Sequence, residues 1–246
     1  MTPRAAASVA GLLVMATLSS SCSYGPTRPA PTPIPPGIPP GAGAPVPEID
    51  IAAPGRTSDQ LVEWAAGINE PMNIPVAALA AYGNAAETMR QTRPKCNLAW
   101  TTLAGIGHVE TRHGRYRGAE LNEDGYALPP IIGIKLDGSP GFANLPDTDG
   151  GVLDGDTEHD RAVGPMQFIP ESWGRYGRDA NGDGRADPNQ IDDAAVAAAR
   201  LLCENGGDLS QPENWQQAIL AYNASRDYVM KVRDAAAAYS VGTTAP

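Results

Sequence analysis

Basic runs are absent from this sequence, and its charge is predominantly of one sign. It has 28 Asp and Glu residues against 18 Lys and Arg, which gives a formal net charge of -10 at pH 7. Nucleic-acid-binding surfaces need clustered Lys and Arg to neutralise phosphate groups. The composition therefore argues against a nucleic-acid partner. With 246 residues, the chain is nevertheless long enough for one domain with a proper hydrophobic core.

The apolar stretch near the N-terminus is too short to span a membrane. Val9–Leu18 falls well below the about 20 residues that a spanning helix needs. It lies between Arg4 and a serine triplet, so we expect residues 1–22 to be an export signal. The segment before Cys22 resembles a lipobox, with its aliphatic residue one place too early. We expect an exported envelope protein, either lipid-anchored through Cys22 to the outer face of the cytoplasmic membrane or secreted.

Cysteine is scarce, with three residues in the chain. If Cys22 is lipidated, Cys96 and Cys203 remain, and an oxidising compartment favours a disulfide between them. Neither cysteine belongs to a cluster of His and Cys, which argues against a metal site at these positions.

Proline and glycine are abundant but unevenly distributed. Proline recurs throughout residues 23–55, between Gly and Ala. Such a stretch buries little apolar surface, so we expect an extended linker that is either a membrane tether or an inert spacer. Folded structure is expected over 56–240, beginning with a capping box formed by Thr57 and Gln60. Helical spacing of apolar residues then predicts a mainly α fold with long irregular loops.

The most informative helix is predicted within Leu98–Arg117, with Asn97 as its N-cap and Gly114 as its stop. Its apolar stripe ends at Glu110. Burial and the negative end of the helix dipole would both raise the pKa of Glu110, as a general acid requires. The alternative is a solvated glutamate at a helix end beside basic residues.

Residues 118–160 form a long stretch rich in Gly, Pro and Asp, with one β-prone run at Ile131–Ile134. Irregular segments of this length are usually functional or disordered. The acidic residues near its end either bind a cation or form a solvated loop, and their irregular spacing favours the loop.

A calcium loop is predicted directly after a short helix at Glu171–Tyr176. Oxygen-bearing residues stand at positions 1, 3 and 5 of an EF-hand-like pattern, followed by the turn glycine Gly184. Position 12 is Gln190 instead of Glu, so Asp192 or Asp193 must supply the closing ligand. An Asx-turn loop without metal is the alternative. The predicted Ca²⁺ ligands are Asp179, Asn181, Asp183 and the Arg185 carbonyl, with Asp192 or Asp193 as the closing ligand.

One isolated polar residue and three helices are predicted in the remaining part of the chain. Gln167 stands alone among apolar residues, so it either satisfies backbone groups or faces a polar ligand in a cleft. An Ala-rich helix is predicted over Ala194–Cys203, capped by Asp192 or Asp193. A helix opened by Pro212 ends in Tyr222-Asn223, and Ser225 caps a last helix.

Three ordered motifs resemble those of lytic transglycosylases, of the membrane-bound lytic transglycosylase B type. They are Gly107-His-Val-Glu110-Thr-Arg-His-Gly114, Gly164-Pro-Met166-Gln167-Phe168 and Ala221-Tyr222-Asn223. The resemblance covers roughly residues 57–240. It implies a lysozyme-like catalytic domain and a calcium loop closed by Asp193. It also implies a monomer that acts on peptidoglycan glycan strands.

The resemblance further implies cleavage of the β-1,4 bond between N-acetylmuramic acid and N-acetylglucosamine, with formation of a 1,6-anhydro ring. Glu110 would be the single acid and base. Residues expected to bind or position the substrate are Met166, Gln167, Tyr222, Asn223 and Asp160.

One departure from the family pattern affects the expected reaction. Family members often have a Ser shortly before the second motif, where this chain reads Glu158-His159-Asp160-Arg161. Asp160 or Glu158 would replace that Ser or activate a hydrolytic water. Hydrolysis by a muramidase therefore remains an alternative, as does a catalytically silent peptidoglycan-binding protein.

Overall fold

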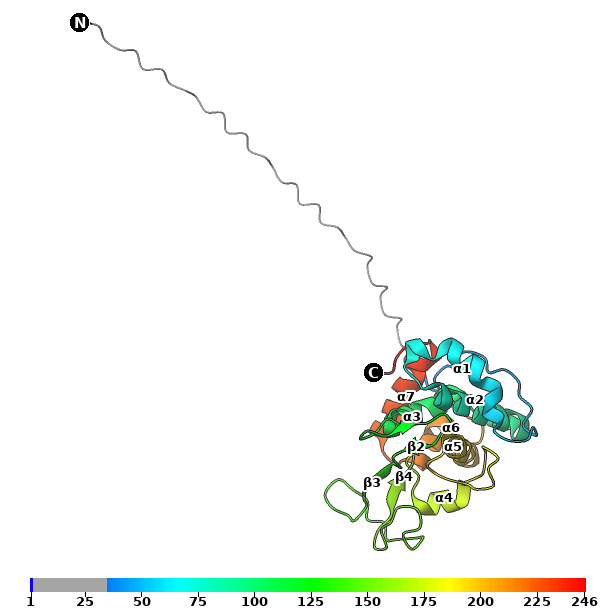
Figure 1. Ribbon diagram of the computed structural model, residues 1–246, viewed down its shortest axis with the longest axis vertical. Helices are drawn as coiled ribbons and strands as arrows, with labels where there is room; N and C mark the ends of the chain where they lie inside the picture. The colour runs from blue at the N-terminus through cyan, green and yellow to red at the C-terminus, as the bar shows by residue number, and fades with distance from the viewer. Residues whose placement is uncertain (2–34) are drawn as a thin grey trace. The chain divides into compact units, whose positions relative to one another are not determined.

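The computed structural model describes Met1 and residues 35–246, so the export signal and the lipidation predicted at Cys22 lie outside the described residues. The mainly α class is confirmed (Figure 1). The α-helices are α1 (Val62–Ile68), α2 (Val76–Thr92), α3 (Trp100–Thr111), α4 (Pro170–Tyr176), α5 (Ile191–Gly206), α6 (Pro212–Tyr222) and α7 (Arg226–Ser240). Short 3₁₀ turns are η1 (Thr57–Leu61), η2 (Glu70–Met72) and η3 (Pro94–Cys96). No described helix has the length and hydropathy that crossing a membrane requires.

The helices pack around one core, in which α3 lies against α7 and α5 lies between α2 and α6. Small residues allow the close approach of α3 and α7, because a Cβ at Gly105 would meet the Val232 carbonyl and Ala236. The Ala-rich face of α5 is fully buried in the same way. Close packing of this kind fixes the direction of α3, which carries Glu110.

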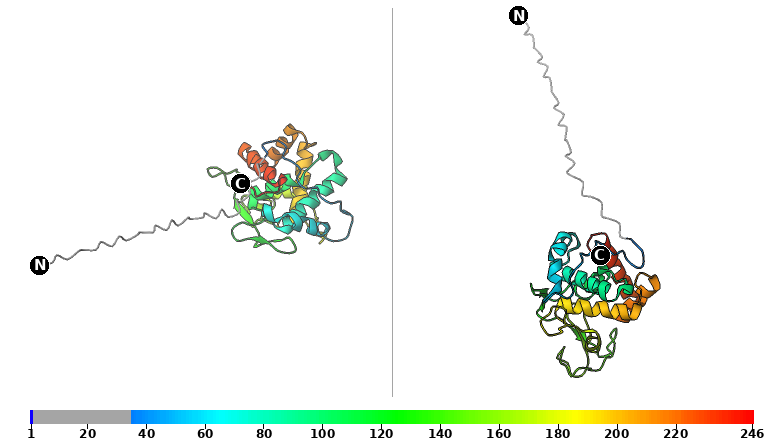
Figure 2. Two further views of the ribbon diagram at one scale, coloured as in Figure 1. Left: turned by 90° about the horizontal axis from the view of Figure 1, so that it is seen from above. Right: turned by 90° about the vertical axis from the view of Figure 1, so that its right-hand side faces the viewer.

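The irregular part of the chain contains two small antiparallel sheets. One pairs β1 (Glu120–Leu121) with β2 (Ala127–Leu128), and the other pairs β3 (Ile132–Lys135) with β4 (Arg161–Val163). The β-prone run predicted from the sequence is therefore a real strand. Figures 1 and 2 show the loops around β3 and β4 on one side of the helical body.

The predicted linker boundary at residue 55 is wrong, because the described part of that segment packs on the domain. Ile49 is buried in the core. Trp100 Nε1 donates a hydrogen bond to the Ala44 carbonyl at 3.0 Å, and Thr101 Oγ1 donates to the Gly41 carbonyl at 2.8 Å. Side-chain donors on α3 thus provide hydrogen bonds to carbonyl groups of the proline-rich segment. The folded domain therefore begins well before residue 56.

Three predicted helix starts also need correction. Asn97 has a left-handed backbone after η3, and Ala99 precedes α3 instead. Thr57 and Gln60 form no capping box; they bond to Asn84 and to the backbone of Asp50. The side chain of Gln190, not an aspartate, caps α5 by accepting the N–H groups of residues 192 and 193. The cap predicted at Ser225 is confirmed.

The disulfide between Cys96 and Cys203 is present, with Cα atoms 5.4 Å apart. It joins η3, directly before α3, to α5.

Candidate active site

Glu110 lies in the last turn of α3, which ends at Thr111. The chain then passes through left-handed backbone at Arg112, His113 and Gly114, so the helix stops two residues earlier than the predicted glycine stop. Thr111 holds this turn: its Oγ1 donates to the Pro165 carbonyl at 2.6 Å and accepts the Gly114 N–H at 2.8 Å. The end of α3 is thereby tied to the segment that carries Gln167.

The Glu110 carboxyl group is held by one phenol. Tyr228, at the start of α7, donates a hydrogen bond from its hydroxyl to Glu110 Oε1 at 2.5 Å. Burial raises the pKa of Glu110 to about 7, although this hydrogen bond lowers it. A carboxyl group with such a pKa is partly protonated at neutral pH, so it can donate a proton and later accept one.

Glu110 borders a cavity of about 800 Å³. Its walls include the apolar side chains of Ile134, Leu136 and Phe142 from the β3 region, and Gln167, Tyr222 and Asn223 face it from two other elements. Among the described residues that line this cavity, Glu110 is the one carboxylic acid. Apolar walls with a few polar groups suit a ligand that has both hydroxyl groups and apolar faces.

A tight turn over Gly164–Phe168 places Gln167 at this cavity. Gly164 has a φ of +77°, and a Cβ there would overlap the Pro188 carbonyl, so the position requires glycine. Gln167 itself has a φ of +50°. Its Nε2 donates to the Gly164 carbonyl at 2.9 Å. The Gln167 amide therefore satisfies a backbone carbonyl and also lines the cavity.

Tyr222, which lines the cavity, packs beside Tyr228. Their rings are nearly parallel, with centroids 6.4 Å apart. The Tyr222 hydroxyl donates to the Met166 carbonyl at 2.6 Å. Burial, followed by the nearby charge of Glu110, raises the pKa of both tyrosines well above the usual value. Both phenols therefore stay protonated and act as hydrogen-bond donors at neutral pH.

Two predicted substrate-binding residues do not line this cavity. The Met166 side chain is fully buried in the core, and only its carbonyl takes part by anchoring Tyr222. Asp160 is 1% exposed, and its two oxygens accept hydrogen bonds from the N–H and hydroxyl of Thr148. Glu158 is bound by Lys135 Nζ at 2.6 Å, which lowers its pKa. Neither Asp160 nor Glu158 lines the cavity that Glu110 borders.

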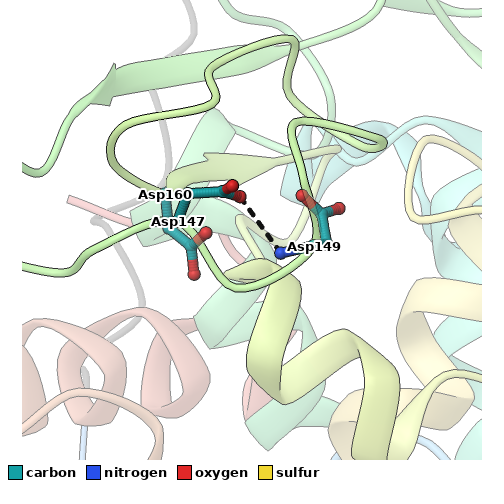
Figure 3. A group of neighbouring side chains, drawn as sticks. All are labelled: Asp147, Asp149 and Asp160. Carbon is teal, nitrogen blue, oxygen red and sulfur yellow. Dashed lines mark hydrogen bonds between the residues drawn. The ribbon is translucent and has the colours of Figure 1, made fainter.

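Asp160 belongs instead to an acidic cluster with Asp147 and Asp149 (Figure 3). One oxygen of each lies within 4.8 Å of the others. Asp147 accepts the N–H groups of residues 149–151, and Asp149 accepts those of residues 152 and 153. These bonds explain the cluster as a set of turns that organise the long loop.

Asp193 closes the loop of residues 179–193. Its carboxylate accepts the N–H groups of Ala180 at 2.7 Å and Asp187 at 2.8 Å. Burial raises the pKa of Asp193 to about 7. The N–H bonds act in the opposite direction and lower this pKa, whereas the charge of Asp179 raises it slightly further. Asp192, the alternative, is bound by Arg56 at 2.7 Å. Asp179, Asn181 and Asp183 also accept backbone N–H groups of this loop, and carboxylate and amide oxygens are the ligand types that Ca²⁺ prefers. The loop carboxylates are less closely gathered than those of the cluster around Asp160.

Sequence reasoning missed residues that lie close to Glu110 or α3 in space but far from Glu110 in the sequence. Tyr228 was not among the predicted site residues, and nothing in its local sequence distinguishes it. A buried chain of hydrogen bonds also lies beside α3. It runs from the Tyr82 hydroxyl through His113 and the Tyr239 hydroxyl to His108, with distances of 3.1, 2.9 and 3.0 Å. Gly107 leaves room for the Tyr82 hydroxyl against α3.

Comparisons with known proteins agree with part of this site. Residues 160–218 match the family described as the transglycosylase SLT domain. The matched segment contains Gln167 and the loop of residues 179–193, but it ends before Tyr222 and does not reach back to Glu110. A search of curated proteins returns no match. Among solved structures, the Escherichia coli lytic transglycosylase Slt35 in complex with bulgecin A is similar over 74% of this chain and 78% of that one, with 16% identity and a TM-score of 0.39.

Proposed function

We propose that this protein is a peptidoglycan lytic transglycosylase with a lysozyme-like catalytic domain. It would cleave the β-1,4 bond between N-acetylmuramic acid and N-acetylglucosamine and leave a 1,6-anhydro end. The observation that carries this proposal is Glu110, a carboxyl group with a pKa of about 7 in a cavity shared with Gln167, Tyr222 and Asn223. The match of residues 160–218 to the transglycosylase SLT domain supports it.

In the first step, protonated Glu110 donates its proton to the glycosidic oxygen as the bond to the muramoyl C1 breaks. The carbonyl oxygen of the substrate's own acetamido group bonds to C1 and forms a cyclic intermediate. In the second step, the Glu110 carboxylate removes the proton of the muramoyl 6-hydroxyl. The 6-oxygen then bonds to C1, the acetamido bond breaks, and Glu110 is protonated again for the next cycle.

The surrounding residues support both proton transfers. The Tyr228 hydroxyl stabilises the anionic form of Glu110 between the two steps, because it donates to the same carboxyl group. We assign Gln167 and Asn223 to the sugar amide and hydroxyl groups, since both face the cavity without charge. Tyr222 positions this wall through its bond to the Met166 carbonyl.

The hydrolytic alternative raised by the sequence would use a second carboxylate beside the scissile bond, either as a base or as a nucleophile. Asp160 is buried against Thr148, and Glu158 is paired with Lys135. Neither lines the cavity that contains Glu110. This arrangement argues against two-carboxylate hydrolysis, and the products decide whether Glu110 activates the muramoyl 6-hydroxyl or a water.

Digestion of purified sacculi, followed by mass spectrometry of the products, tests the proposal. We expect muropeptides with 1,6-anhydromuramoyl ends. Reducing ends would instead identify a hydrolytic muramidase, and the absence of products would identify a binding protein. Either result contradicts the proposed reaction.

We further propose that the loop of residues 179–193 holds one structural Ca²⁺. Asp179, Asn181, Asp183, the Arg185 carbonyl and Asp193 would bind it, and the bound ion would neutralise the repulsion between the carboxylates of Asp179 and Asp193. Its role is to stabilise the loop before α5. No step of the reaction passes through the ion.

The proposed substrate also fits export to the cell envelope. The targeting pattern of residues 1–22 and the lipobox-like segment before Cys22 support this location. Cell fractionation of the wild type and of Cys22→Ala would test it. Wild-type protein in the membrane fraction and Cys22→Ala protein in the soluble exported fraction would support the anchor.

A further inference from the structure

Two histidines and two tyrosines form a buried chain that the proposed reaction does not use. His113, in the turn after α3, bonds through Nδ1 to the Tyr82 hydroxyl of α2 at 3.1 Å and through Nε2 to the Tyr239 hydroxyl of α7 at 2.9 Å. The Tyr239 hydroxyl also bonds to His108 Nδ1 at 3.0 Å. Tyr82, His113 and Tyr239 are at most 2% exposed. Buried polar groups are costly unless each one has a partner, so the chain acts as one unit.

The chain satisfies all of its hydrogen bonds in one direction only. Burial lowers the pKa of His108 and, more strongly, that of His113, so both rings are neutral at neutral pH. A neutral imidazole has one N–H donor and one acceptor nitrogen. Among the described residues, the Tyr82 hydroxyl has one hydrogen-bond partner, His113 Nδ1, to which it must donate. The other ring nitrogen, Nε2, therefore donates to Tyr239, and the Tyr239 hydroxyl donates to His108.

The backbone of His113 depends on this support. Its φ of +63° lies in the left-handed region, as do those of Arg112 and Gly114. Non-glycine residues adopt that region at an energetic cost and keep it only where the surrounding structure holds them. The His113 N–H donates to the Gly107 carbonyl at 2.8 Å, and two bonds hold the ring. The turn directly after Glu110 is thus tied to α2 and α7.

Two tyrosines of α7 contact α3 on different sides. Tyr228 donates to Glu110 Oε1 at 2.5 Å, and Tyr239 bonds to His108. Because each helical residue turns by about 100°, positions 108 and 110 point to different sides of α3. The two helices also meet at Gly105, where a Cβ would overlap the backbone of α7. Such a smooth contact resists sliding less than large interlocking side chains do. The bonds of Tyr239 therefore fix how α7 lies on α3.

We infer that His113 and Tyr239 are positioning residues for Glu110. They hold α7 in register on α3 and thereby keep the Tyr228 hydroxyl on the Glu110 carboxyl group. Neither His113 nor Tyr239 lines the cavity assigned to the glycan. This inference rests on the proposed function, in which the Tyr228 bond stabilises the anionic form of Glu110 between two proton transfers.

Other titratable and charged groups also face Glu110 or share a cavity with it. They are Tyr222 of α6, Arg112, Arg115, Tyr116 and Arg117 after α3, and Lys231 and Asp234 of α7. A test of positioning must leave all of these groups in place. It must also separate a change at Glu110 from a general loss of stability.

Two shape-conserving variants meet these conditions. Tyr239→Phe removes the hydroxyl that joins α7 to His113 and His108. The matched control is Thr102→Val, which removes a different buried hydroxyl of α3, the acceptor of Trp215 Nε1 of α6 at 3.0 Å. Both variants should lower the melting temperature, because each leaves buried polar groups without a partner. The readout that distinguishes them is the pKa of Glu110. It is measured without substrate by ¹³C NMR of protein labelled at the Glu carboxyl carbons, and Glu110→Gln protein identifies the resonance.

Tyr239→Phe should raise the pKa of Glu110 by roughly 0.5–1, because complete loss of a hydrogen bond to a carboxylate would raise it by about 1–2. Thr102→Val should leave this pKa unchanged. Added to Tyr228→Phe, Tyr239→Phe should cause no further rise, since the bond that it positions is already gone. An unchanged pKa in Tyr239→Phe, an equal rise in Thr102→Val, or a further rise in the double variant would overturn the inference.

The wild-type protein allows a second test that does not depend on how the variants fold. ¹⁵N NMR of the imidazole rings distinguishes the two neutral tautomers. We expect the Nε2–H tautomer for both His113 and His108, as the direction of the chain requires. An Nδ1–H tautomer at His113 would leave the Tyr82 hydroxyl without an acceptor and would overturn the assigned chain.

The failure of this inference can be told apart from the failure of the proposed function. If the wild type forms no anhydro products, the proposed function fails, whereas the pKa of Glu110 would still respond to Tyr239→Phe. If anhydro products form, the alkaline limb of the kcat/KM profile should move to higher pH in Tyr239→Phe protein. Should that limb and the pKa of Glu110 both stay in place, only the inference fails.

Discussion

At the residue scale, the proposed chemistry depends on the proton of Glu110. Burial favours its neutral form, while the Tyr228 hydroxyl favours its anionic form, and burial dominates. The resulting pKa of about 7 suits a group that must donate a proton and then accept one. Thr111 places this carboxyl group, because it ties the end of α3 to the Pro165 carbonyl.

The substitution Glu110→Gln should abolish cleavage of the glycosidic bond while preserving the fold and glycan binding. The amide keeps the shape of the side chain but cannot transfer a carboxyl proton, and such catalysis contributes about 10²–10⁴-fold. Release of anhydro-muropeptides from purified peptidoglycan measures the loss, with circular dichroism as the check on folding. Asp160→Asn and Glu158→Gln are the matched controls and should be milder. Substantial activity in the Glu110→Gln protein would contradict the mechanism.

The pH dependence follows from the same group. Activity should fall as the pH rises above about 7, because the acid that starts the reaction loses its proton. Tyr228→Phe removes the hydrogen bond that lowers the pKa of Glu110, so the alkaline limb of the kcat/KM profile should move to higher pH. Tyr116→Phe, near Glu110 but without a bond to it, is the control. A shift to lower pH would show that Tyr228 acts otherwise.

Stability should depend on pH with the matching sign. The folded-state pKa of Glu110 is above its ordinary value, so its contribution to folding is fully present below about 4.5 and is lost as the pH rises through about 7. Glu110→Gln protein should therefore gain in melting temperature relative to the wild type between pH 5 and pH 8. Thermal melts at a series of pH values measure this difference, and a constant difference would refute the assignment.

At the element scale, the loop before α5 contacts the turn that carries Gln167 and also leads into the core helix α5. Its backbone carbonyl at Pro188 lies against Gly164, and its last residues begin the Ala-rich helix of the core. A fixed conformation of residues 179–193 therefore supports the turn that carries Gln167 as well as the start of α5. Asp193 secures this order by accepting N–H groups from across the loop.

Added calcium should raise the melting temperature, and EDTA should reverse the effect. Binding to the folded state alone stabilises by about 2.7 kcal/mol when free calcium is 100 times the dissociation constant. Asp193→Asn should remove the response, whereas Asp160→Asn should retain it. The opposite result would assign calcium to the cluster of Asp147, Asp149 and Asp160. No response in the wild type, with no ion found by elemental analysis, would contradict the calcium proposal.

At the scale of the whole folded domain, the Cys96–Cys203 disulfide links residues 107 positions apart. It connects η3, just before α3, with α5. A cross-link over so long a loop restricts the unfolded chain more than the folded one. Export through an oxidising compartment would thus stabilise the framework that holds Glu110.

The Cys96→Ser and Cys203→Ser double variant should lose about 2–4 kcal/mol of unfolding free energy, the usual range for a disulfide. Urea denaturation at neutral pH measures this loss. The Cys22→Ser variant is the control and should keep the wild-type value. An unchanged midpoint in the double variant would show that the cross-link contributes little to stability.

The sequence by itself determined the local features of this protein. An apolar stripe predicted the helix that contains α3, because burial of one helix face imposes that spacing, and helices were also predicted near α4, α5, α6 and α7. The β-prone run predicted at Ile131–Ile134 overlaps β3 (Ile132–Lys135), and the cysteine count with export predicted the pairing of Cys96 with Cys203. Glu110, Gln167, Tyr222 and Asn223 were selected by motif and do line one cavity.

Only the tertiary structure decided which distant residues share a site. Tyr228 lies 118 positions from Glu110 in the chain, and its bond to Glu110 depends on how α7 packs against α3. The same packing brings Lys231 of α7 into the lining of one cavity with Arg112 and Arg115. Asp160 was misassigned, because its neighbours in sequence suggested the cavity whereas the loop directs its oxygens to Thr148. Local spacing does not encode contacts of this kind, which arise only when the core has chosen the directions of its helices.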